Sequence, residues 1–456
     1  MFAQSVFIFR RDLRLRDNTG LIAAMEASTQ VMPVFIVDPG LFGLWRDAVA
    51  RMTFLAQALR HLDSEIAKSG GRLRVLYGEP AVVLGQLLAA HAIGAVYVNR
   101  DFTPLSQRRD SKIRALCQRR GVQFHSYADQ LMNEPESIAK LDGTPYSVFT
   151  PYFRKAREQL IALPASKVGF DFADAEPGSL LSDSVFEKYL YQKVASNLMS
   201  PRVALARLKK LDHYDESKDQ PAEAGTSRLS AHLRFGTVSV REVYQSISQH
   251  HSSSHGLIRQ LYWRDFYFHI GFHFPHVFTS AFRAKYNHLS WDDNEAGYRL
   301  WQEGKTGFPI IDAGMRELLA TGFMHNRVRM IVASFLTKNL LIDWRRGEAH
   351  FAKHLVDFDP AINNGNWQWG ASTGCDAQPY FRIFNPWRQQ LRFDKECRYI
   401  KQWVPELKDM DARQIHRLEK VGDGYLPVIA DLRASGEESK RRFSFLNAGQ
   451  NTEHLL

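Results

Sequence analysis

Residues 6–14, Val-Phe-Ile-Phe-Arg-Arg-Asp-Leu-Arg, join a short apolar run directly to a charged cluster near the amino terminus. Four consecutive apolar residues in this setting are typical of a strand that is buried on both faces of a sheet. The segment is too short and too charged to be a secretory signal peptide. It therefore predicts that the chain opens with a buried parallel strand whose carboxyl end carries charged side chains.

The same pattern of short apolar runs recurs through the first 130 residues. Further strands are expected at 31–37, 73–77, 95–99 and 122–127, and helical spacing separates them at 19–28, 51–68, 81–91 and 107–119. Strands that alternate with helices predict a doubly wound, Rossmann-like parallel sheet. Ligands of such sheets bind at the carboxyl ends of strands, which lie here near Arg10, Arg11, Asp38 and residues 99–101.

Beyond residue 130 the pattern changes twice. From 131 to 199 the periodicity weakens and turn residues accumulate, which predicts a connector. Helical patterns follow at 203–211, 240–250, 257–269, 310–321, 327–341 and 349–356. We therefore expect an α/β domain at 1–130, a connector at 131–199 and an all-α domain at 200–456. A chain of 456 residues has room for two or three domains.

Composition limits the class of protein. The formal net charge of +10 is a modest basic excess that favours a polyanionic partner. The three cysteines are widely spaced and form no Cys-x-x-Cys pair, so we expect a reduced, cytoplasmic protein without a metal site. Polar residues and glycines interrupt the apolar run at 81–98, which predicts a helix and a strand instead of a membrane span.

One segment imitates a nucleotide-binding loop. Glu303-Gly-Lys-Thr306 resembles the end of a P-loop, but the motif needs a glycine where this chain has Arg299. No strand is expected before it. We therefore reject a phosphate-binding role for this segment.

Residues 357–369, Asp-Phe-Asp-Pro-Ala-Ile-Asn-Asn-Gly-Asn-Trp-Gln-Trp, carry the strongest functional signal. On a strand, Trp367 and Trp369 would share one face, whereas on a helix residues two apart point nearly in opposite directions. A helix would place one indole in the core and the other against a cavity. The tryptophans either fill a large aromatic core or handle electrons and stack on planar ligands.

Three further segments combine polar and aromatic residues. Residues 225–230, Gly-Thr-Ser-Arg-Leu-Ser, offer hydroxyl and backbone donors for a pyrophosphate, or else cap the next helix. Residues 260–267 place Gln260, Trp263, Arg264 and Tyr267 at helical spacing. Residues 324–330 supply an arginine, Arg329, that is expected to form a buried pair with Asp357 or Asp359, beside a polar cofactor or as a structural ion pair alone.

These segments, in this order and with the charged start at 10–14, resemble the cryptochrome/photolyase family. Residues 301–313, 324–327, 333–336 and 380–386 are similar to class I cyclobutane pyrimidine dimer photolyases in particular. The resemblance implies a light-driven DNA repair enzyme, a carbon–carbon lyase that splits pyrimidine dimers by electron transfer from photoexcited reduced FAD to a flipped-out dimer. It also implies that FAD binds the helical domain and that an antenna chromophore can bind the α/β domain.

The resemblance also assigns roles to individual residues. FAD contacts fall on Tyr214, Thr226, Ser227, Arg228, Leu229, Ser230, Asn326, Arg329, Asp357, Asp359 and Asn363, with Asn363 facing the flavin N5. The electron-transfer chain falls on Trp367, Trp344 and Trp291. Contacts to the dimer fall on Gln260, Trp263, Met330 and Trp369, and contacts to DNA phosphates on Lys218, Arg327 and Arg382. The resemblance is to proteins that act on DNA as monomers, without a metal or a membrane.

The chain departs from the family pattern at three positions. Gln260 replaces a glutamate that contacts the dimer in most class I photolyases, and Phe323 replaces a common tryptophan. Thr103 replaces the glutamate expected for a folate antenna, so a different antenna, or none, is expected. Gln260 leaves open the alternative of a cryptochrome-like photoreceptor. A (6-4) photolyase is disfavoured because Asn326 and Met330 occupy the positions of its two histidines.

Overall fold

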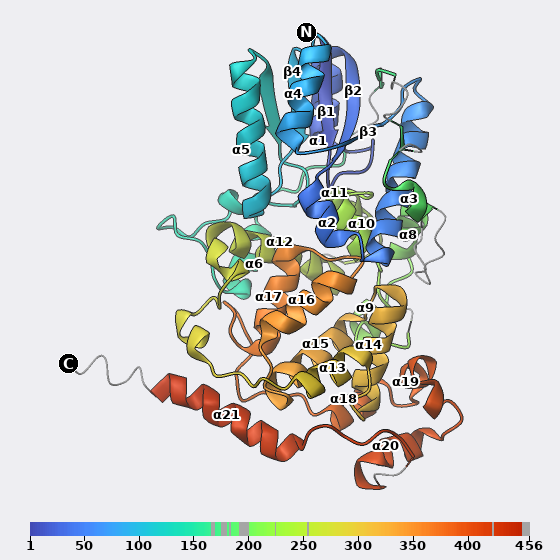
Figure 1. The fold of residues 1–456 in the computed structure, drawn as a ribbon, viewed down its shortest axis with the longest axis vertical. Helices are drawn as coiled ribbons and strands as arrows, with labels where there is room; N and C mark the ends of the chain where they lie inside the picture. The colour runs from blue at the N-terminus through green and yellow to red at the C-terminus, as the bar shows by residue number, and fades with distance from the viewer. Residues whose placement is uncertain are drawn as a thin grey trace, which may run out of the picture. The chain divides into compact units, whose positions relative to one another are not determined.

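The computed structural model describes residues 1–165, 169–174, 180–181, 184–190, 200–223, 225–252, 255–421 and 424–448. The chain forms two compact units (Figure 1). The first comprises residues 1–146, 150–212 and 227–275, and the second comprises 147–149, 213–226 and 276–456. The sheet therefore shares its compact unit with helices from beyond residue 200.

A five-stranded parallel sheet organises the first unit, with strand order β3-β2-β1-β4-β5. Its strands are β1 (Phe2–Phe9), β2 (Ser28–Val37), β3 (Arg74–Tyr77), β4 (Ala95–Asn99) and β5 (Gln123–Tyr127). β1 lies between β2 and β4, with Val6 opposite both Met32 and Val96, which explains why its apolar run is buried. The predicted doubly wound parallel sheet is confirmed.

Helices follow the strands as the sequence predicts. They are α1 (Thr19–Ala27), α3 (Val49–Ala67), α4 (Pro80–Ala90) and α5 (Pro104–Arg119). A short helix, α2 (Pro39–Trp45), was not expected. It begins where Asp38 accepts a hydrogen bond from the Gly40 amide and Pro39 occupies the first turn, a combination that starts helices too short to show periodicity.

The other helices of the first unit are α6 (Phe149–Ala156, whose first residue belongs to the second unit), α7 (Glu187–Leu190), α8 (Pro201–Leu208), α10 (Ser230–Phe235), α11 (Val240–His250) and α12 (Gly256–His273). A buried ion network joins α11 to the loops of the sheet. Arg241 binds Asp17 at 2.9 Å and Asp129 at 2.8 Å, and Arg14 binds Asp129 at 2.8 Å. Removing one member would leave a buried charge unpaired.

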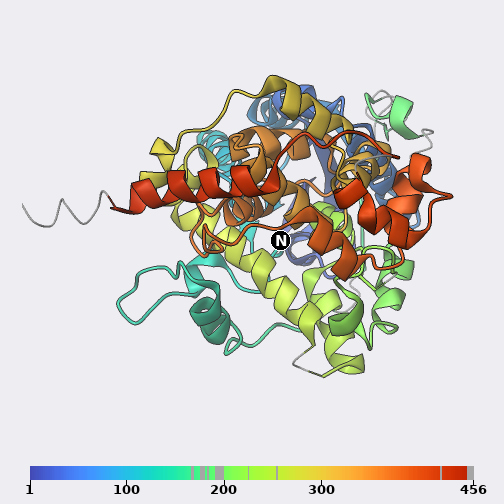
Figure 2. The same cartoon turned by 90° about the horizontal axis from the view of Figure 1, so that it is seen from below.

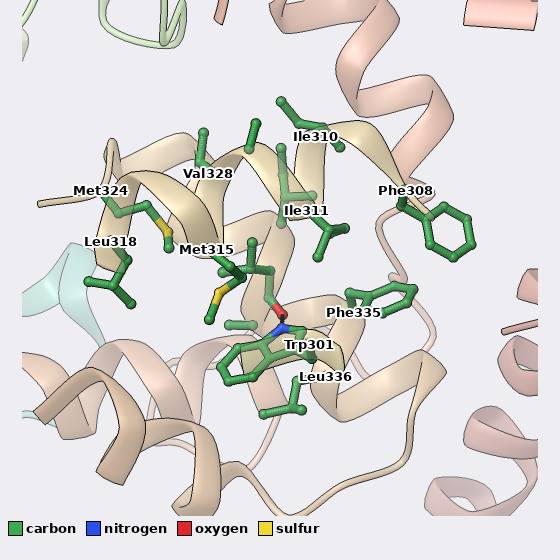
Figure 3. Close-up of a cluster of buried hydrophobic side chains, with 14 of the residues drawn as sticks. Trp301, Phe308, Ile310, Ile311, Met315, Leu318, Met324, Val328, Phe335 and Leu336 are labelled. Atoms are coloured by element: carbon green, nitrogen blue, oxygen red, sulfur yellow. Dashed lines mark hydrogen bonds between the residues drawn. The ribbon is translucent and has the colours of Figure 1, made fainter. Parts of the chain in front are cut away.

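The second unit is helical in its described elements (Figures 1 and 2). These are α9 (Tyr214–Ser217), α13 (Glu295–Glu303), α14 (Pro309–Thr321), α15 (Asn326–Ser334), α16 (Trp344–His354), α17 (Pro360–Ala371), α18 (Pro386–Phe393), α19 (Arg398–Trp403), α20 (Ala412–Val421) and α21 (Leu432–Ala448). Short turns of helix occur at η3 (Pro275–Phe278, whose first residue belongs to the first unit), η4 (Ala284–His288) and η6 (Pro405–Leu407). The core gathers around Trp301, with Met315, Val328 and Leu336 (Figure 3). The predicted all-α character of this part is confirmed.

The helix expected at 327–341 is interrupted. α15 ends at Ser334 and continues as a π-helical segment, η5 (Phe335–Asn339), in which the Leu340 amide reaches back to the Phe335 carbonyl. The Thr337 hydroxyl donates to the Ala333 carbonyl at 2.8 Å, which competes with the regular helical ladder. The apolar spacing alone does not reveal such a wide turn.

The segment that resembles a P-loop, Glu303-Gly-Lys-Thr306, has a structural role. Gly304 adopts φ +63° and ends α13, so a helix, not a strand, precedes the segment. The Asp312 carboxylate accepts hydrogen bonds from the Thr306 amide at 2.6 Å, its hydroxyl at 2.7 Å and the Tyr425 hydroxyl at 2.9 Å. The prediction that no strand precedes this segment is confirmed.

Within the described part of the chain, no helix combines the length and apolar character that a bilayer crossing requires.

Candidate functional site

The tryptophan pair lies on a helix. Asp359 caps α17 by accepting hydrogen bonds from the amides of Ala361 at 3.0 Å and Ile362 at 3.3 Å, and Pro360 occupies the first turn. Trp367 is 2% exposed, whereas Trp369 is partly exposed. The prediction that a helix places one indole in the core is confirmed, and the position of Trp369 against a cavity stays a prediction.

Two amide side chains fix the rotation of α17 about its axis. Asn364 and Gln368, one turn apart, both donate to the Val277 carbonyl, at 2.9 and 3.0 Å. Gln368 Oε1 also accepts from the Phe282 amide at 2.8 Å. Because Trp367 lies beside these anchors, its indole is held in the core.

Asn363 lies on the same helix and is 6% exposed. Its Nδ2 donates to the backbone carbonyl of Glu348 in α16 at 3.2 Å. This contact uses one of the two N–H donors of the amide and fixes its orientation, so Oδ1 is the group that can accept a hydrogen bond. Burial raises the pKa of the Glu348 carboxyl to about 7, which places a weakly acidic group beside this helix.

Arg329 pairs with Asp357, not with Asp359. Its Nη2 lies 2.9 Å from Asp357 Oδ2, and its Nε donates to the Met324 carbonyl at 2.8 Å. Asp357 is 5% exposed at its side chain, and its Oδ1 has no hydrogen-bond partner among the described residues. A purely structural ion pair would satisfy both oxygens, so this oxygen fits a polar ligand.

The segment at 225–230 crosses from the second unit into the first. A Cβ at Gly225 would lie 2.3 Å from the Ser217 hydroxyl, so glycine is needed where the segment packs on α9. Helix α9 also carries Tyr214, whose ring has the Lys218 amine 5.6 Å from its centroid. In the first unit, Leu229 precedes α10 without any side-chain cap. Ser227 Oγ instead accepts from the amide of Leu229, the residue that precedes α10, at 3.4 Å.

Arg228 adopts φ +54° and is exposed, and Ser230, also exposed, begins α10. A left-handed conformation at a residue with a side chain is uncommon and occurs often at ligand sites.

Helix α12 of the first unit carries two of the predicted dimer contacts. Gln260 is exposed and Trp263 is partly exposed, with the Trp263 ring 5.7 Å from that of Tyr267. Arg264 is buried instead, and donates to the Gln130 carbonyl at 2.9 Å. Gln260 and Trp263 are thus accessible, while Arg264 has a structural role.

Of the three tryptophans predicted to transfer electrons, all in the second unit, two are buried and one is partly exposed. Trp367 and Trp344 are 2% and 1% exposed and belong to one apolar cluster. Trp291 is partly exposed and packs against this cluster. The Arg345 guanidinium lies 4.8 Å from the Trp344 ring centroid. A series from buried to accessible indoles suits electron supply from solvent.

The predicted DNA-binding cations differ in their surroundings. Arg382 is exposed, whereas Arg327 pairs with Asp219 at 2.9 Å and lies 4.4 Å over the Phe393 ring. Lys218 forms an ion pair with Asp215.

The start of α15 carries the two residues that disfavour a (6-4) photolyase. Asn326 is exposed, and its Nδ2 lies 3.8 Å from the sulfur of Met330. Neither side chain supplies a titratable proton near neutral pH.

Charged side chains gather at the carboxyl ends of the strands, as predicted, and largely pair with one another. Arg10 binds Asp110 at 2.8 Å and Arg11 binds Asp101 at 3.2 Å. Thr103 caps α5, accepting from the Ser106 amide. It supplies no carboxylate to a folate.

Two residues of the second unit were given no individual role from the sequence. Gly347 of α16 has no room for a side chain, since a Cβ would lie 2.2 Å from Trp367 Cη2. Trp301 contacts Trp367 edge to face, with ring centroids 6.2 Å apart. Neither position follows from local spacing, because both contacts depend on packing between separate helices.

Among the residues that the structure describes, no group of three or more histidine, cysteine, aspartate or glutamate side chains is arranged to hold a metal ion. Cys117, Cys375 and Cys397 are all free thiols.

Two family models match the chain. The one described as DNA photolyase covers residues 5–168, and the one described as FAD binding domain of DNA photolyase covers residues 257–444. A curated relative, the deoxyribodipyrimidine photo-lyase of Synechococcus sp., is 38% identical over 94% of this chain and 92% of its own length.

Solved photolyase structures are similar to this chain over nearly its whole length. An archaeal photolyase from Sulfolobus tokodaii, solved with two FAD molecules that imply a novel light-harvesting cofactor, is 40% identical with a TM-score of 0.87, over 97% of this chain and 99% of that chain. A class III photolyase from Agrobacterium tumefaciens is 33% identical with a TM-score of 0.88, over 98% of each chain.

Proposed function

Because this chain belongs to the cryptochrome/photolyase family, we propose that it is a light-driven DNA repair enzyme that splits cyclobutane pyrimidine dimers. The observation that carries the proposal is the environment of α17. A buried carboxylate oxygen without a partner, an amide with a directed acceptor and a buried indole lie on or next to this helix. Core packing alone requires none of these polar features.

The residues present fit FAD. Asp357 Oδ1 can accept from a ring N–H of the isoalloxazine, and Arg329 beside it can neutralise added negative charge. Asn363 Oδ1 can accept from a protonated N5. Asn326 and Asp359 complete the proposed contacts to the ring and ribose. The residues proposed to bind the pyrophosphate and its sugar are Tyr214, Thr226, Ser227, Arg228, Leu229 and Ser230.

When bound in its reduced form, FAD supplies the light-driven electron that opens the cyclobutane ring and receives it back afterwards. The chain's own residues position and protect this chemistry. Trp367, Trp344 and Trp291 supply electrons from the surface to keep the cofactor reduced. The carboxamide of Gln260 offers an N–H to a thymine carbonyl on which negative charge develops.

The flipped-out dimer needs apolar surfaces for stacking. Trp263 and Trp369 are both partly exposed, and each offers an indole face, while Met330 adds a polarisable side chain. A damaged pair costs less to unstack than an intact one, which supports selectivity. Lys218, Arg327 and Arg382 are proposed to contact DNA phosphates, at a salt-dependent gain in affinity.

The proposed domain limits are 1–130, 131–199 and 200–456, with FAD binding and catalysis in the last. Because Thr103 offers no carboxylate, the α/β domain is expected to bind a deazaflavin or another flavin as antenna in place of folate, or no antenna. The protein acts as a monomer in the cytoplasm.

The test is to purify the protein, load and reduce FAD, and illuminate it with an oligonucleotide that contains one thymine dimer. Loss of the dimer in light and not in darkness supports repair. Bound, photoreducible FAD without loss of the dimer would instead indicate the photoreceptor alternative. Failure to bind FAD would refute both.

A further inference from the structure

Trp301 lies at the centre of the apolar core of the second unit. It is 0% exposed, and its indole N–H donates to the Val332 carbonyl at 3.2 Å (Figure 3). Such an indole fills space, and that role alone would explain its burial. Its aromatic neighbours on two sides point to a second role.

On one side Trp301 meets Trp367. The ring centroids are 6.2 Å apart at an interplanar angle of 73°, a favourable edge-to-face contact. Phe351 packs against both rings, with centroids 4.9 Å from Trp367 and 6.3 Å from Trp301. The two indoles are therefore direct neighbours within one aromatic cluster.

On the other side Trp301 meets Tyr298, one turn earlier on α13. The rings stack at 5.9 Å with an angle of 15°. Tyr298 is partly exposed, and its hydroxyl donates to the Arg346 carbonyl at 2.9 Å. A continuous series of touching rings thus runs from Trp367 to an accessible phenol, and the residues already assigned to electron transfer do not include Trp301 or Tyr298.

We propose that Trp301 and Tyr298 form a second route by which electrons reach Trp367, an inference that rests on the proposed function. Photoexcited flavin is the oxidant that removes one electron from Trp367. The Trp367 radical cation then takes one electron from Trp301, which takes one from Tyr298. Tyr298 releases its phenolic proton to solvent water with that electron. A dissolved thiol afterwards returns one electron and one proton to Tyr298.

The surroundings make this the slower of the two routes. The Trp301 N–H faces a carbonyl oxygen, which is too weak a base to accept a proton, so an oxidised Trp301 keeps its charge. The Arg346 guanidinium lies 4.0 Å over the Tyr298 ring and opposes positive charge there, although Arg346 also pairs with Glu295. Electron supply through Tyr298 therefore requires loss of its proton.

The experiment uses the FAD-loaded protein with a thiol in solution. Trp344→Phe interrupts the first route, and we expect slow but measurable light-driven flavin reduction to remain. Adding Trp301→Phe or Tyr298→Phe should abolish this remainder. Adding Tyr244→Phe, a partly exposed tyrosine on α11 of the first unit, should not. Electron paramagnetic resonance should detect a tyrosyl radical in Trp344→Phe that Tyr298→Phe removes.

A second measurement avoids the cofactor. In the FAD-free protein, azide radicals generated by pulse radiolysis oxidise tryptophan, and transfer to tyrosine appears as growth of tyrosyl absorption. We expect this growth to be smaller in Trp301→Phe and Tyr298→Phe than in Tyr244→Phe. Thermal unfolding identifies any variant that no longer folds.

Complete loss of photoreduction in Trp344→Phe alone, or a remainder that neither second substitution changes, would overturn the inference. These results would leave the proposed function intact, because wild-type protein would still reduce its flavin in light and repair the dimer. Wild-type protein that did neither would overturn both.

Discussion

The side-chain amide of Asn363 donates from Nδ2 to the backbone carbonyl of Glu348 at 3.2 Å, and this contact joins α17 to α16 beside the buried Trp367. The amide cannot turn over without losing that bond. Its oxygen is therefore directed as a permanent acceptor, whatever the redox state of a flavin beside it.

Asn363→Leu keeps the volume and removes the acceptor. Loss of one hydrogen bond to a buried group costs about 1 kcal/mol, which for a two-electron couple lowers the midpoint potential by ~20 mV. Spectroelectrochemical titration of the bound flavin measures this shift. Asn366→Leu is the control, since Asn366 is exposed on the same helix. Equal potentials in the two variants would exclude the assigned role.

Gly347→Ala should displace the Trp367 indole, because the added Cβ would lie 2.2 Å from Cη2 and 2.6 Å from Leu336 Cδ2. Overpacking of this kind costs about 1–3 kcal/mol. Gly370→Ala is the matched control on α17, where the nearest neighbour of the added Cβ would be Ala333 Cβ at 3.4 Å. The midpoint temperature of thermal unfolding and the rate of flavin photoreduction should both fall for Gly347→Ala, and neither should fall for Gly370→Ala.

Asp357→Asn leaves Arg329 without its charged partner and changes the oxygen offered to the cofactor. Removing one partner of a fully buried ion pair destabilises a protein by about 3–5 kcal/mol. Because Arg329 is 25% exposed, we expect the free energy of unfolding to fall by only about 1–2 kcal/mol. The purified variant should retain less FAD per chain. Glu437→Gln, in the exposed pair with Arg433, serves as the control. Full FAD content in Asp357→Asn would argue against the proposed contact.

Local patterns were enough to predict much of the fold and part of the site. The apolar run at 6–9 predicts a central buried strand because burial on both faces removes alternation. The opposite orientations of Trp367 and Trp369 follow from helical geometry alone, once Asp359 and Pro360 start the helix.

Other features depend on packing between distant segments. Asp357 and Asp359 are equally suitable partners for Arg329 in sequence, and the structure selects Asp357 because Asp359 is occupied in capping α17. The need for glycine at 347 arises only where α16 meets the Trp367 ring. The π-helical turn after Ser334 likewise has no signature in apolar spacing.

The Asp265 carboxyl makes the free energy of unfolding of the first unit depend on pH. It is 1% exposed and accepts from the amides of Met132 and Asn133, yet burial raises the pKa of its carboxyl to about 7. The folded state therefore binds more protons than the unfolded state between about pH 4 and pH 7, so this contribution falls as pH rises through that window.

Asp265→Asn removes this titration. The difference in unfolding free energy, wild type minus variant, should therefore decrease from pH 4 to pH 8, by on the order of 4 kcal/mol at most. Urea unfolding at several pH values measures it. The neighbouring His269, whose pKa burial lowers to about 4, contributes with the opposite sign in both proteins and largely cancels. A difference that is flat with pH would show that Asp265 is ionised in the folded state throughout.

Gln260→Glu should raise the quantum yield of dimer repair. A carboxylic acid can donate a proton or a short charge-assisted hydrogen bond to the thymine carbonyl, whereas the carboxamide donates only a neutral N–H. Gln260 is exposed on α12, so the substitution should leave thermal stability unchanged within about 0.5 kcal/mol. Gln302→Glu, on α13, controls for the added negative charge. A repair yield that stays equal or falls in Gln260→Glu would show that the amide already supplies the hydrogen bond that repair requires.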